Sequence, residues 1–299
     1  MLRLIALFLL LAAGPAWAQG PGGAAPRYTD RPLSATPLDR AITQRHWAPG
    51  LNDGFVPQGL AFARDTLFVG AYQSRNARQN RGPARIFAVD PQSGAAIGGF
   101  DLPASIGHAD GLAALSDGGM LFLADNSRSL HAFDLPRSLQ AGHAVSVGRA
   151  RRLANEPGLG SNLLTSDGEH LWFGRFSRDG EAWLVAAGIA ALFNGDAAPF
   201  ALRDAARRIP LPPHAQGASF DSAGQLWISA SNSRMGRLYR LDAKTGAVLA
   251  EYPAMAGLED LTHDRDGRLW AVGEAGSQRW NAWATFFPLL FAIDPATLQ

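Results

Sequence analysis

The sequence predicts an all-β fold, a β-propeller of five four-stranded blades, and three observations support this prediction. One strand motif recurs five times at a spacing that suits propeller blades. Short runs of aromatic and β-branched residues, which favour strands over helices, follow each copy. The 33 glycines and the 47% of hydrophobic residues are typical of a turn-rich protein that is large enough to bury a core.

The first strand of each repeat begins with a motif whose second residue is polar. Counted from Gln58, these second positions are 52, 52, 54 and 43 residues apart. A repeat of this size accommodates four short strands and their turns. The five copies are PQGLA at 57–61, ADGLA at 109–113, SNLLT at 161–165, AQGAS at 215–219 and LEDLT at 258–262.

The second strand of each repeat is an apolar run that contains an aromatic side chain. In three repeats an Asp-Gly pair precedes this run, at residues 117–118, 167–168 and 266–267, and such a pair is a strong hairpin signal. The first two strands of a blade are therefore expected to pair as a hairpin. The five runs lie at residues 67–69, 121–123, 171–173, 226–228 and 269–271.

The third strand ends in aspartate in four repeats, at residues 90, 134, 242 and 294, whereas the copy around Trp183 is degenerate. A turn and a more polar fourth strand follow, most clearly at residues 245–250, but the fifth repeat stops after its third strand. We expect residues 40–47 to supply the missing outer strand, because this closes the ring and hides an exposed edge. Six blades remain an alternative, although residues 19–54 are few for a further blade.

The first eighteen residues have the pattern of a secretory signal peptide. Arg3 precedes an apolar stretch at residues 4–13, and Ala16 and Ala18 are small residues at a cleavage site. A membrane span needs about 20 apolar residues, and Gly14 and Pro15 interrupt this stretch too early. We therefore expect a periplasmic or secreted protein without a membrane span after cleavage. Its parts are the signal peptide (1–18), a flexible leader rich in glycine and proline (19–37) and a single propeller domain (38–299).

Charge and cysteine content exclude several classes of protein. Loss of Arg3 with the signal peptide reduces the 27 basic residues to 26, against 26 acidic ones, whereas nucleic-acid binders normally have a basic excess on one face. Cysteine is absent, which excludes a thiolate metal site and a cysteine nucleophile. Neither a Walker loop nor a dinucleotide-binding fingerprint occurs, so we expect no nucleotide cofactor. The prediction is a monomer that binds a small molecule at the propeller mouth.

One blade resembles a known family. Residues 107–113, GHADGLA, followed by GMLFLADN at 119–126, are similar to the blade motif of the SMP-30/gluconolactonase and strictosidine-synthase-like propellers, and NHL-repeat propellers resemble it too. The resemblance implies an enzyme whose axis holds a divalent cation, with Asp110 as a ligand and candidate base. The Glu-Gly-Pro and Pro-Asn-Asp motifs of gluconolactonase-like enzymes do not occur in this chain.

Five polar residues are expected to form a ring around the axis, because the first strand of each blade lines the channel. Oxygen atoms of carboxylates and amides are ligands that Ca²⁺ prefers, so Asp110, Glu259 and Asn162 are candidate metal ligands. His108 and His214 each lie two residues before a ring position and are candidate ligands or bases. The alternative is that these polar groups only bind each other and water. The ring consists of Gln58, Asp110, Asn162, Gln216 and Glu259.

An arginine follows the second strand of every repeat, in a loop expected at the same mouth. A guanidinium group binds carboxylate or phosphate in a two-pronged fashion. If the five arginines converge, they attract an anionic or polyhydroxylated molecule, and salt weakens its binding. The alternative is an inherited turn sequence with solvated charges. The long loop at 276–288 adds Trp280 and Trp283, which suit sugar or aromatic ligands. The arginines are Arg75, Arg128, Arg178, Arg234 and Arg279.

Two functions are consistent with these patterns. The first is a hydrolase of a lactone or ester, in which a divalent cation such as Ca²⁺ polarises the carbonyl and Asp110, His108 or Glu259 handles the proton. The second is a non-catalytic exported binding module that presents the same mouth to a small anionic or sugar-like ligand or to a protein partner.

Overall fold

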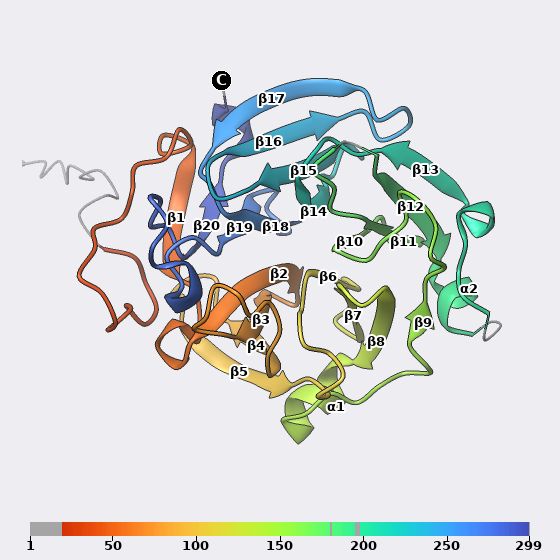
Figure 1. Cartoon of the computed structure of the whole chain (residues 1–299), viewed down its shortest axis with the longest axis horizontal. Helices are drawn as coiled ribbons and strands as arrows, with labels where there is room; N and C mark the ends of the chain where they lie inside the picture. The colour runs from red at the N-terminus through yellow and green to blue at the C-terminus, as the bar shows by residue number, and fades with distance from the viewer. Residues whose placement is uncertain (1–19, 180, 195–197, 299) are drawn as a thin grey trace, which may run out of the picture.

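The computed structural model describes residues 20–179, 181–194 and 198–298 and contains five four-stranded antiparallel sheets arranged in a ring (Figure 1). Each sheet is one blade, with the first strand of each repeat nearest the axis. The prediction of a five-bladed propeller is therefore confirmed. The expected signal peptide, residues 1–18, lies outside the described residues.

Four blades are built from consecutive strands. The first contains β2 (Phe55–Ala63), β3 (Thr66–Gln73), β4 (Ala84–Val89) and β5 (Ala96–Asp101). The second contains β6 (Gly111–Ala114), β7 (Met120–Asp125), β8 (Ser129–Asp134) and β9 (Arg151–Arg152). The third contains β10 (Leu163–Ser166), β11 (His170–Gly174), β12 (Trp183–Gly188) and β13 (Arg207–Pro210). The fourth contains β14 (Ala215–Phe220), β15 (Leu226–Ser231), β16 (Gly236–Leu241) and β17 (Val248–Ala254).

The N-terminal strand closes the ring, as the sequence predicts. The fifth blade contains β18 (Leu258–His263), β19 (Leu269–Gly273), β20 (Leu289–Ile293) and, outermost, β1 (Ile42–Trp47). β1 runs antiparallel to β20, with Arg45 opposite Phe291 and Trp47 opposite Leu289. The two ends of the propeller are thus joined by backbone hydrogen bonds, and the edge of β20 is covered.

A shared hydrogen bond locks the inner hairpin in three blades. In each, a turn aspartate accepts a hydrogen bond from the indole N–H of a buried tryptophan on the second strand. The pairs are Asp167 with Trp172 at 2.7 Å, Asp221 with Trp227 at 3.0 Å and Asp264 with Trp270 at 2.9 Å. Each bond ties a turn to the core, because these indoles are at most 2% exposed. The predicted hairpins are confirmed in all five blades.

The aspartates that end four of the third strands stabilise the turns that follow them. Each side chain accepts a hydrogen bond from a backbone N–H two or three residues further on, which is the geometry of an Asx turn or a helix cap. The bonds run from Gln92 to Asp90, Arg137 to Asp134, Lys244 to Asp242 and Ala296 to Asp294, at 2.9, 2.9, 2.9 and 3.0 Å. The degenerate third copy still forms a strand, β12, without this aspartate.

Asp260 lies at the centre of the ring and joins several blades. Its carboxylate accepts hydrogen bonds from the backbone N–H of Leu60 at 2.8 Å and of Leu112 at 3.1 Å, in the first and second blades. The Asp260 residue is fully buried, and the N–H of Ala218 in the fourth blade contributes as well. The first strand of that blade passes so close that a Cβ on Gly217 would lie 2.4 Å from the Cα of Asp260. The innermost strands thus meet around one carboxylate.

Helices are few, and α1 (Leu135–Ala141) and α2 (Ile189–Phe193) lie at the periphery (Figure 1). The other helical segments are the short 3₁₀ turns η2 (Leu51–Asp53), η3 (Leu202–Asp204), η4 (Gln278–Trp280) and η5 (Pro295–Thr297). Within the part of the chain that the structure describes, no helix has the length and apolar character that crossing a membrane requires.

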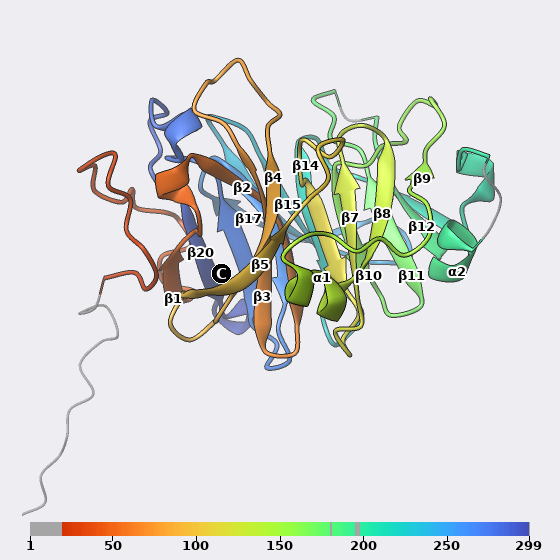
Figure 2. The same ribbon diagram turned by 90° about the horizontal axis from the view of Figure 1, so that it is seen from below.

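The described part of the expected leader runs beside the fifth blade (Figure 2). Its Tyr28 hydroxyl donates to the carbonyl of Gly276 at 2.6 Å, and Arg31 donates to the carbonyls of Trp283 and Ala284, both at 2.9 Å. These bonds attach the leader to the long loop at residues 276–288. That loop stands at the upper end of the axis, the end at which the first strands begin.

Candidate functional site

Three of the predicted ring residues lie at irregularities of the first strands. The pairing register shifts between Pro57 and Leu60 in β2, between Ala215 and Gly217 in β14 and between Leu258 and Leu261 in β18. Such β-bulges re-aim side chains, here those of Gln58, Gln216 and Glu259. The other two, Asp110 and Asn162, directly precede β6 and β10.

A chain of hydrogen bonds links two of the ring amides to two buried glutamates. Gln216 Nε2 donates to Glu259 Oε1 at 3.2 Å, and Gln58 Nε2 donates to Glu274 Oε2 at 2.9 Å. A further side-chain hydrogen bond joins Glu259 to Glu274. The indole N–H of Trp280 donates to Glu274 Oε2 at 2.7 Å. We call Glu259 and Glu274 the acid pair.

Burial raises the pKa values of both members of the acid pair. It raises the pKa of Glu274 to about 7, against hydrogen bonds from Trp280 and Gln58 that favour its carboxylate. Burial and the neighbouring charge of Glu274 raise the pKa of Glu259 well above its usual value. Glu259 is 5% exposed and Glu274 is 9% exposed, so neither charge is well solvated. Two carboxyl groups in contact ionise in two steps that belong to the pair.

A histidine and an aspartate pair with each other beside the acid pair. His108 Nδ1 and Asp110 Oδ2 lie 3.0 Å apart, which is ion-pair distance, and neither atom makes a hydrogen bond of good geometry to a described residue. Both atoms are buried, and the imidazole of His108 stacks on Tyr72 with ring centres 4.1 Å apart. Buried polar atoms without such a hydrogen bond can bind water or a ligand. His108 and Asp110, both predicted from the sequence, are thus brought together beside Glu274.

Two further predicted residues lie apart from the acid pair. The Oδ1 atom of Asn162 accepts a hydrogen bond from the backbone N–H of Phe176 at 3.1 Å. His214 packs near the ring of Phe176, at 5.7 Å between centres, and its Nδ1 has no partner among the described residues. Asn162 therefore supports its own loop, and His214 remains a candidate for contact with a larger ligand.

The predicted metal ligands do not form a coordination sphere. Asp110 faces His108, Glu259 is held between Gln216 and Glu274, and Asn162 is bonded to backbone. The described residues contain no group of three or more His, Cys, Asp or Glu side chains placed to hold a metal ion. Calcium requires six to eight oxygen ligands, so this donor set does not fit it.

The five arginines occupy different environments rather than one equivalent ring. Arg128 donates to the carbonyls of Ala154 and Leu159 at 2.9 and 3.0 Å. Arg75 donates to Gln278 at 2.8 Å, whereas Arg178 and Arg234 are exposed. Arg279 is buried, donates to the Tyr72 hydroxyl and lies 4.1 Å from the ring centre of Trp280. Burial lowers the pKa of Arg279 to about 10.

Trp280 and Trp283 form an aromatic surface beside the acid pair, which we call the aromatic wall. Trp280 and Trp283 stack with ring centres 4.5 Å apart, and the guanidinium of Arg279 lies 4.1 Å from the centre of the Trp280 ring. Because Trp280 also donates to Glu274, the wall and the acid pair form one unit. Such a surface suits the flat or apolar face of a small ligand.

Sequence reasoning missed Glu274 and Tyr72. Both follow the aromatic residue of a second strand by four positions, Phe68 in one case and Trp270 in the other. The available signal was a single acidic residue directly after the buried run of β19, two residues before the aromatic loop begins. An acidic residue outside the repeated motif carries no pattern that points to the axis, so the sequence assigns this glutamate no role.

The contribution of Glu274 to the free energy of unfolding is expected to fall as the pH rises from about 5 to about 7, whereas His263, whose pKa is lowered to about 4, acts in the opposite direction below pH 6.5. Because the pKa of Glu274 is raised from 4.5 to about 7 in the folded protein, the folded state binds more protons than the unfolded state in this window. Stability that is present below pH 4.5 is therefore lost as Glu274 ionises, by up to about 1.4 kcal/mol per pH unit. Urea unfolding at several pH values measures the slope.

The variant Glu274→Gln lacks this contribution, so the free energy of unfolding of the wild type minus that of the variant should decrease from pH 5 to pH 7. Glu251 is an exposed glutamate on β17, and Glu251→Gln should keep the wild-type slope. Equal slopes in the wild type and Glu274→Gln would show that Glu274 titrates at its ordinary pKa.

Comparisons with known proteins identify the fold but no family. No protein-family model matches the sequence, and no curated protein matches it. Among solved structures, glutaminyl cyclase from Myxococcus xanthus superposes with a TM-score of 0.55 at 17% identity, over 85% of this chain and 97% of that one. The PQQ-bound aldose sugar dehydrogenase from Streptomyces coelicolor gives 0.47 at 15% identity, over 80% and 94%. The resemblance to the SMP-30/gluconolactonase family stays a prediction, and what the comparisons support is a β-propeller fold that is also found in enzymes.

Proposed function

We propose that this propeller is an exported hydrolase of a small lactone or ester that uses the acid pair as its acid and base. The observation that supports the proposal is the contact between two buried carboxyl groups at the upper end of the axis, next to the buried pair of His108 and Asp110. Buried titratable groups with shifted pKa values cluster at catalytic sites.

Hydrolysis requires a base that activates water and an acid that protonates the leaving oxygen. The carboxylate of the acid pair takes a proton from water as the water oxygen bonds to the carbonyl carbon. The protonated partner then gives its proton to the alkoxide as the ester bond breaks, so the pair ends with one proton, as it began. His108 Nδ1 is available to bind a substrate oxygen, and Trp280 and Trp283 form the wall against which the substrate packs.

The divalent cation is not needed for this sequence of steps. Calcium assistance stays a prediction that two measurements check: metal analysis of the calcium-soaked protein, and the thermal stability of Asp110→Ala with and without calcium. A bound ion, together with calcium-dependent stability that Asp110→Ala abolishes, would restore the cation to the mechanism.

The rival function is a binding module without turnover, favoured by the missing Glu-Gly-Pro and Pro-Asn-Asp motifs. A panel of γ- and δ-lactones, simple esters and a peptide with N-terminal glutamine separates the two functions. The peptide is included because a solved structure of similar fold is a glutaminyl cyclase. Turnover of any member supports an enzyme, and lactone or ester turnover supports this proposal. Stabilisation by panel members without turnover would favour the binding module.

A further inference from the structure

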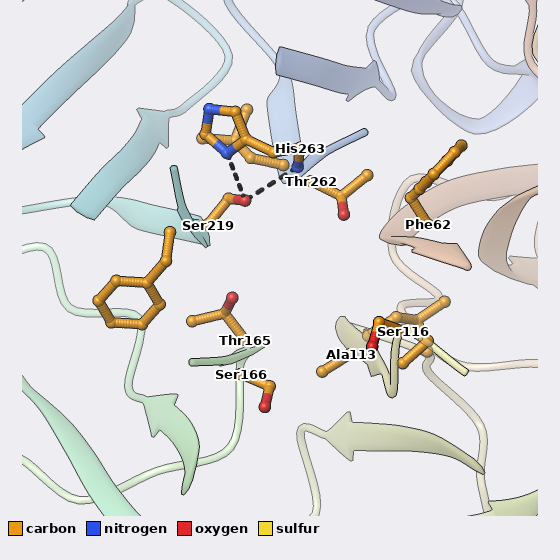
Figure 3. A pocket seen from close by; sticks show the side chains of 12 residues that line it. Phe62, Ala113, Ser116, Thr165, Ser166, Ser219, Thr262 and His263 are labelled. Atoms are coloured by element: carbon orange, nitrogen blue, oxygen red, sulfur yellow. Dashed lines mark hydrogen bonds between the residues drawn. The ribbon is translucent and has the colours of Figure 1, made fainter. Parts of the chain in front are cut away.

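A pocket lies at the lower end of the axis, where the first strands end. It has a volume of about 140 Å³, and all five first strands contribute residues to its lining (Figure 3). Leu112 and Leu261 line its inner side, toward the centre of the ring. The ring positions and this pocket lie at opposite ends of the first strands. In β18, Glu259 at the upper end and His263 at the lower end are four residues apart, which corresponds to about 13 Å along a strand. The pocket is therefore distinct from the acid pair.

The lining carries hydroxyl groups that the protein leaves unpaired. Thr165, Thr262 and Ser116 line the pocket, and none of their hydroxyls bonds to any described residue. Thr165 is only 7% exposed, so its hydroxyl has little other access to water. Figure 3 shows Thr165 and Thr262 on two sides of the space, with Ser219 and His263 between them. A hydroxyl both donates and accepts, and these groups therefore suit a ligand that does the same.

Ser219 and His263 form a fixed, uncharged side of the pocket. The Oγ of Ser219 lies 2.8 Å from His263 Nδ1 and accepts a hydrogen bond from the His263 backbone N–H at 3.0 Å. Burial lowers the pKa of His263 to about 4, so the imidazole is neutral at neutral pH. The ring therefore brings no positive charge that would attract an anion.

The charges around the pocket mouth also disfavour an anion. A neighbouring cavity of about 530 Å³ shares Phe62, Ser116, Ser166, Phe220 and His263 with the pocket, so the two are continuous. Four aspartates and two arginines line this outer cavity. Arg265 is paired with Asp65 at 3.1 Å, Arg268 is paired with Asp264 at 2.7 Å, and Arg64 donates to the carbonyl of Asp117. With Arg268 counted, the aspartates exceed the arginines by one, so the mouth carries no net positive charge that would attract an anion.

The volume of the pocket and its aromatic side chains indicate the size and the surface of the ligand. A cavity of about 150 Å³ holds a molecule of the size of benzene, which has about six heavy atoms. Phe62 and Phe220 line both the pocket and the outer cavity, and aromatic faces pack against the C–H face of a sugar ring. We propose that the lower end of the axis is a second binding site, for an uncharged vicinal diol that belongs to a polyol or to a sugar.

Ligand-observed NMR tests the proposal with four probes at about 10 mM, a range suited to ligands with few heavy atoms. The probes are glycerol, erythritol, glucose and glucuronate. The wild type should bind at least one of the three neutral probes, and more tightly than it binds glucuronate. Binding of glycerol and erythritol but not glucose identifies a polyol as the source of the diol, and the reverse identifies a sugar.

The variant carrying both Thr165→Val and Thr262→Val keeps the shape of the pocket and loses two hydroxyls. We expect it to bind the neutral probe about tenfold more weakly, as the loss of two hydrogen bonds implies. Thr285→Val, in the upper loop, makes the same chemical change elsewhere and should bind like the wild type. Glu274→Gln should also bind like the wild type, which separates this site from the proposed hydrolase site.

Three results would overturn the proposal. They are no binding of any neutral probe by the wild type, equal binding by the double threonine variant, and loss of binding in Glu274→Gln, which would place the ligand at the upper end. A failure of the lactone and ester panel leaves this inference untouched, because the two sites share none of the residues that carry the arguments.

Discussion

Replacing Asp260 with alanine should lower the free energy of unfolding by about 4 kcal/mol. The substitution leaves the N–H groups of Leu60 and Leu112 buried without an acceptor, and each such group costs about 1 to 3 kcal/mol. The cavity left at the centre of the ring adds to this loss. Burial raises the pKa of Asp260, but the backbone donors that surround it oppose this effect. Urea unfolding followed by tryptophan fluorescence measures the change.

Asp260→Asn separates the effect of the hydrogen bonds from that of the cavity. The amide fills the same space but replaces one acceptor oxygen with a donor that faces N–H groups, so we expect a large loss here too. Asp266 is exposed and pairs with Arg268 at 3.1 Å, and Asp266→Ala should cost less than about 1 kcal/mol. A loss below about 1 kcal/mol in Asp260→Ala would show that the innermost strands do not depend on this carboxylate.

Glu274→Gln should lower kcat for the hydrolysed substrate by about 10²- to 10⁴-fold, the usual contribution of a positioned acid or base. The amide keeps the hydrogen bond from Trp280 possible but cannot take up or release the proton that the proposed mechanism assigns to the acid pair. The folded structure should survive, since glutamine has nearly the same shape and removes a buried charge. Steady-state kinetics on the best substrate of the panel measure the effect.

The pH dependence gives this prediction a second readout. In the wild type, kcat/KM should follow a bell-shaped curve, because one member of the acid pair must be ionised and the other protonated. In Glu274→Gln the residual activity should lose one limb of that curve. Glu251→Gln changes an exposed glutamate on β17 and should leave both kcat and the curve unchanged. A Glu274→Gln variant that keeps more than a tenth of the wild-type kcat would remove this residue from the chemistry.

The strands and their order could be predicted from the sequence because they depend on local patterns. The apolar run of each second strand and the aspartate at the end of four third strands are visible in short windows. The repeat spacing then fixes the number of blades, and the missing strand of the fifth repeat leads to β1. The structure follows these predictions closely, since the hairpins and the turn aspartates rest on interactions between neighbours in sequence. The closing strand could be predicted, although it pairs across the whole chain, because the fifth repeat lacks an outer strand.

The candidate site could be predicted only in part. The equivalence of Gln58, Gln216 and Glu259 follows from the repeat, whereas the 3.0 Å contact between His108 and Asp110 is seen only in the structure. The five arginines do not form the single ring that the repeat suggests. A repeated turn fixes the course of the backbone, but it does not fix the partners of a long side chain. Arg128 donates to carbonyl groups of the segment between β9 and β10, whereas Arg279 contacts Tyr72 and Trp280.

The sequence by itself determined that this chain forms a ring of blades with polar residues at the start of each inner strand. The tertiary structure alone decided which of these residues act together. Gln58 contacts Glu274 across 216 positions, and Asp260 reaches Leu60 across 200. Such contacts arise because closing the ring brings the first and last blades together and because bulges turn individual side chains toward the axis. No local sequence pattern specifies these long-range contacts. The contact of Glu274 with Gln58 and the existence of the lower pocket can therefore be inferred only from the closed ring.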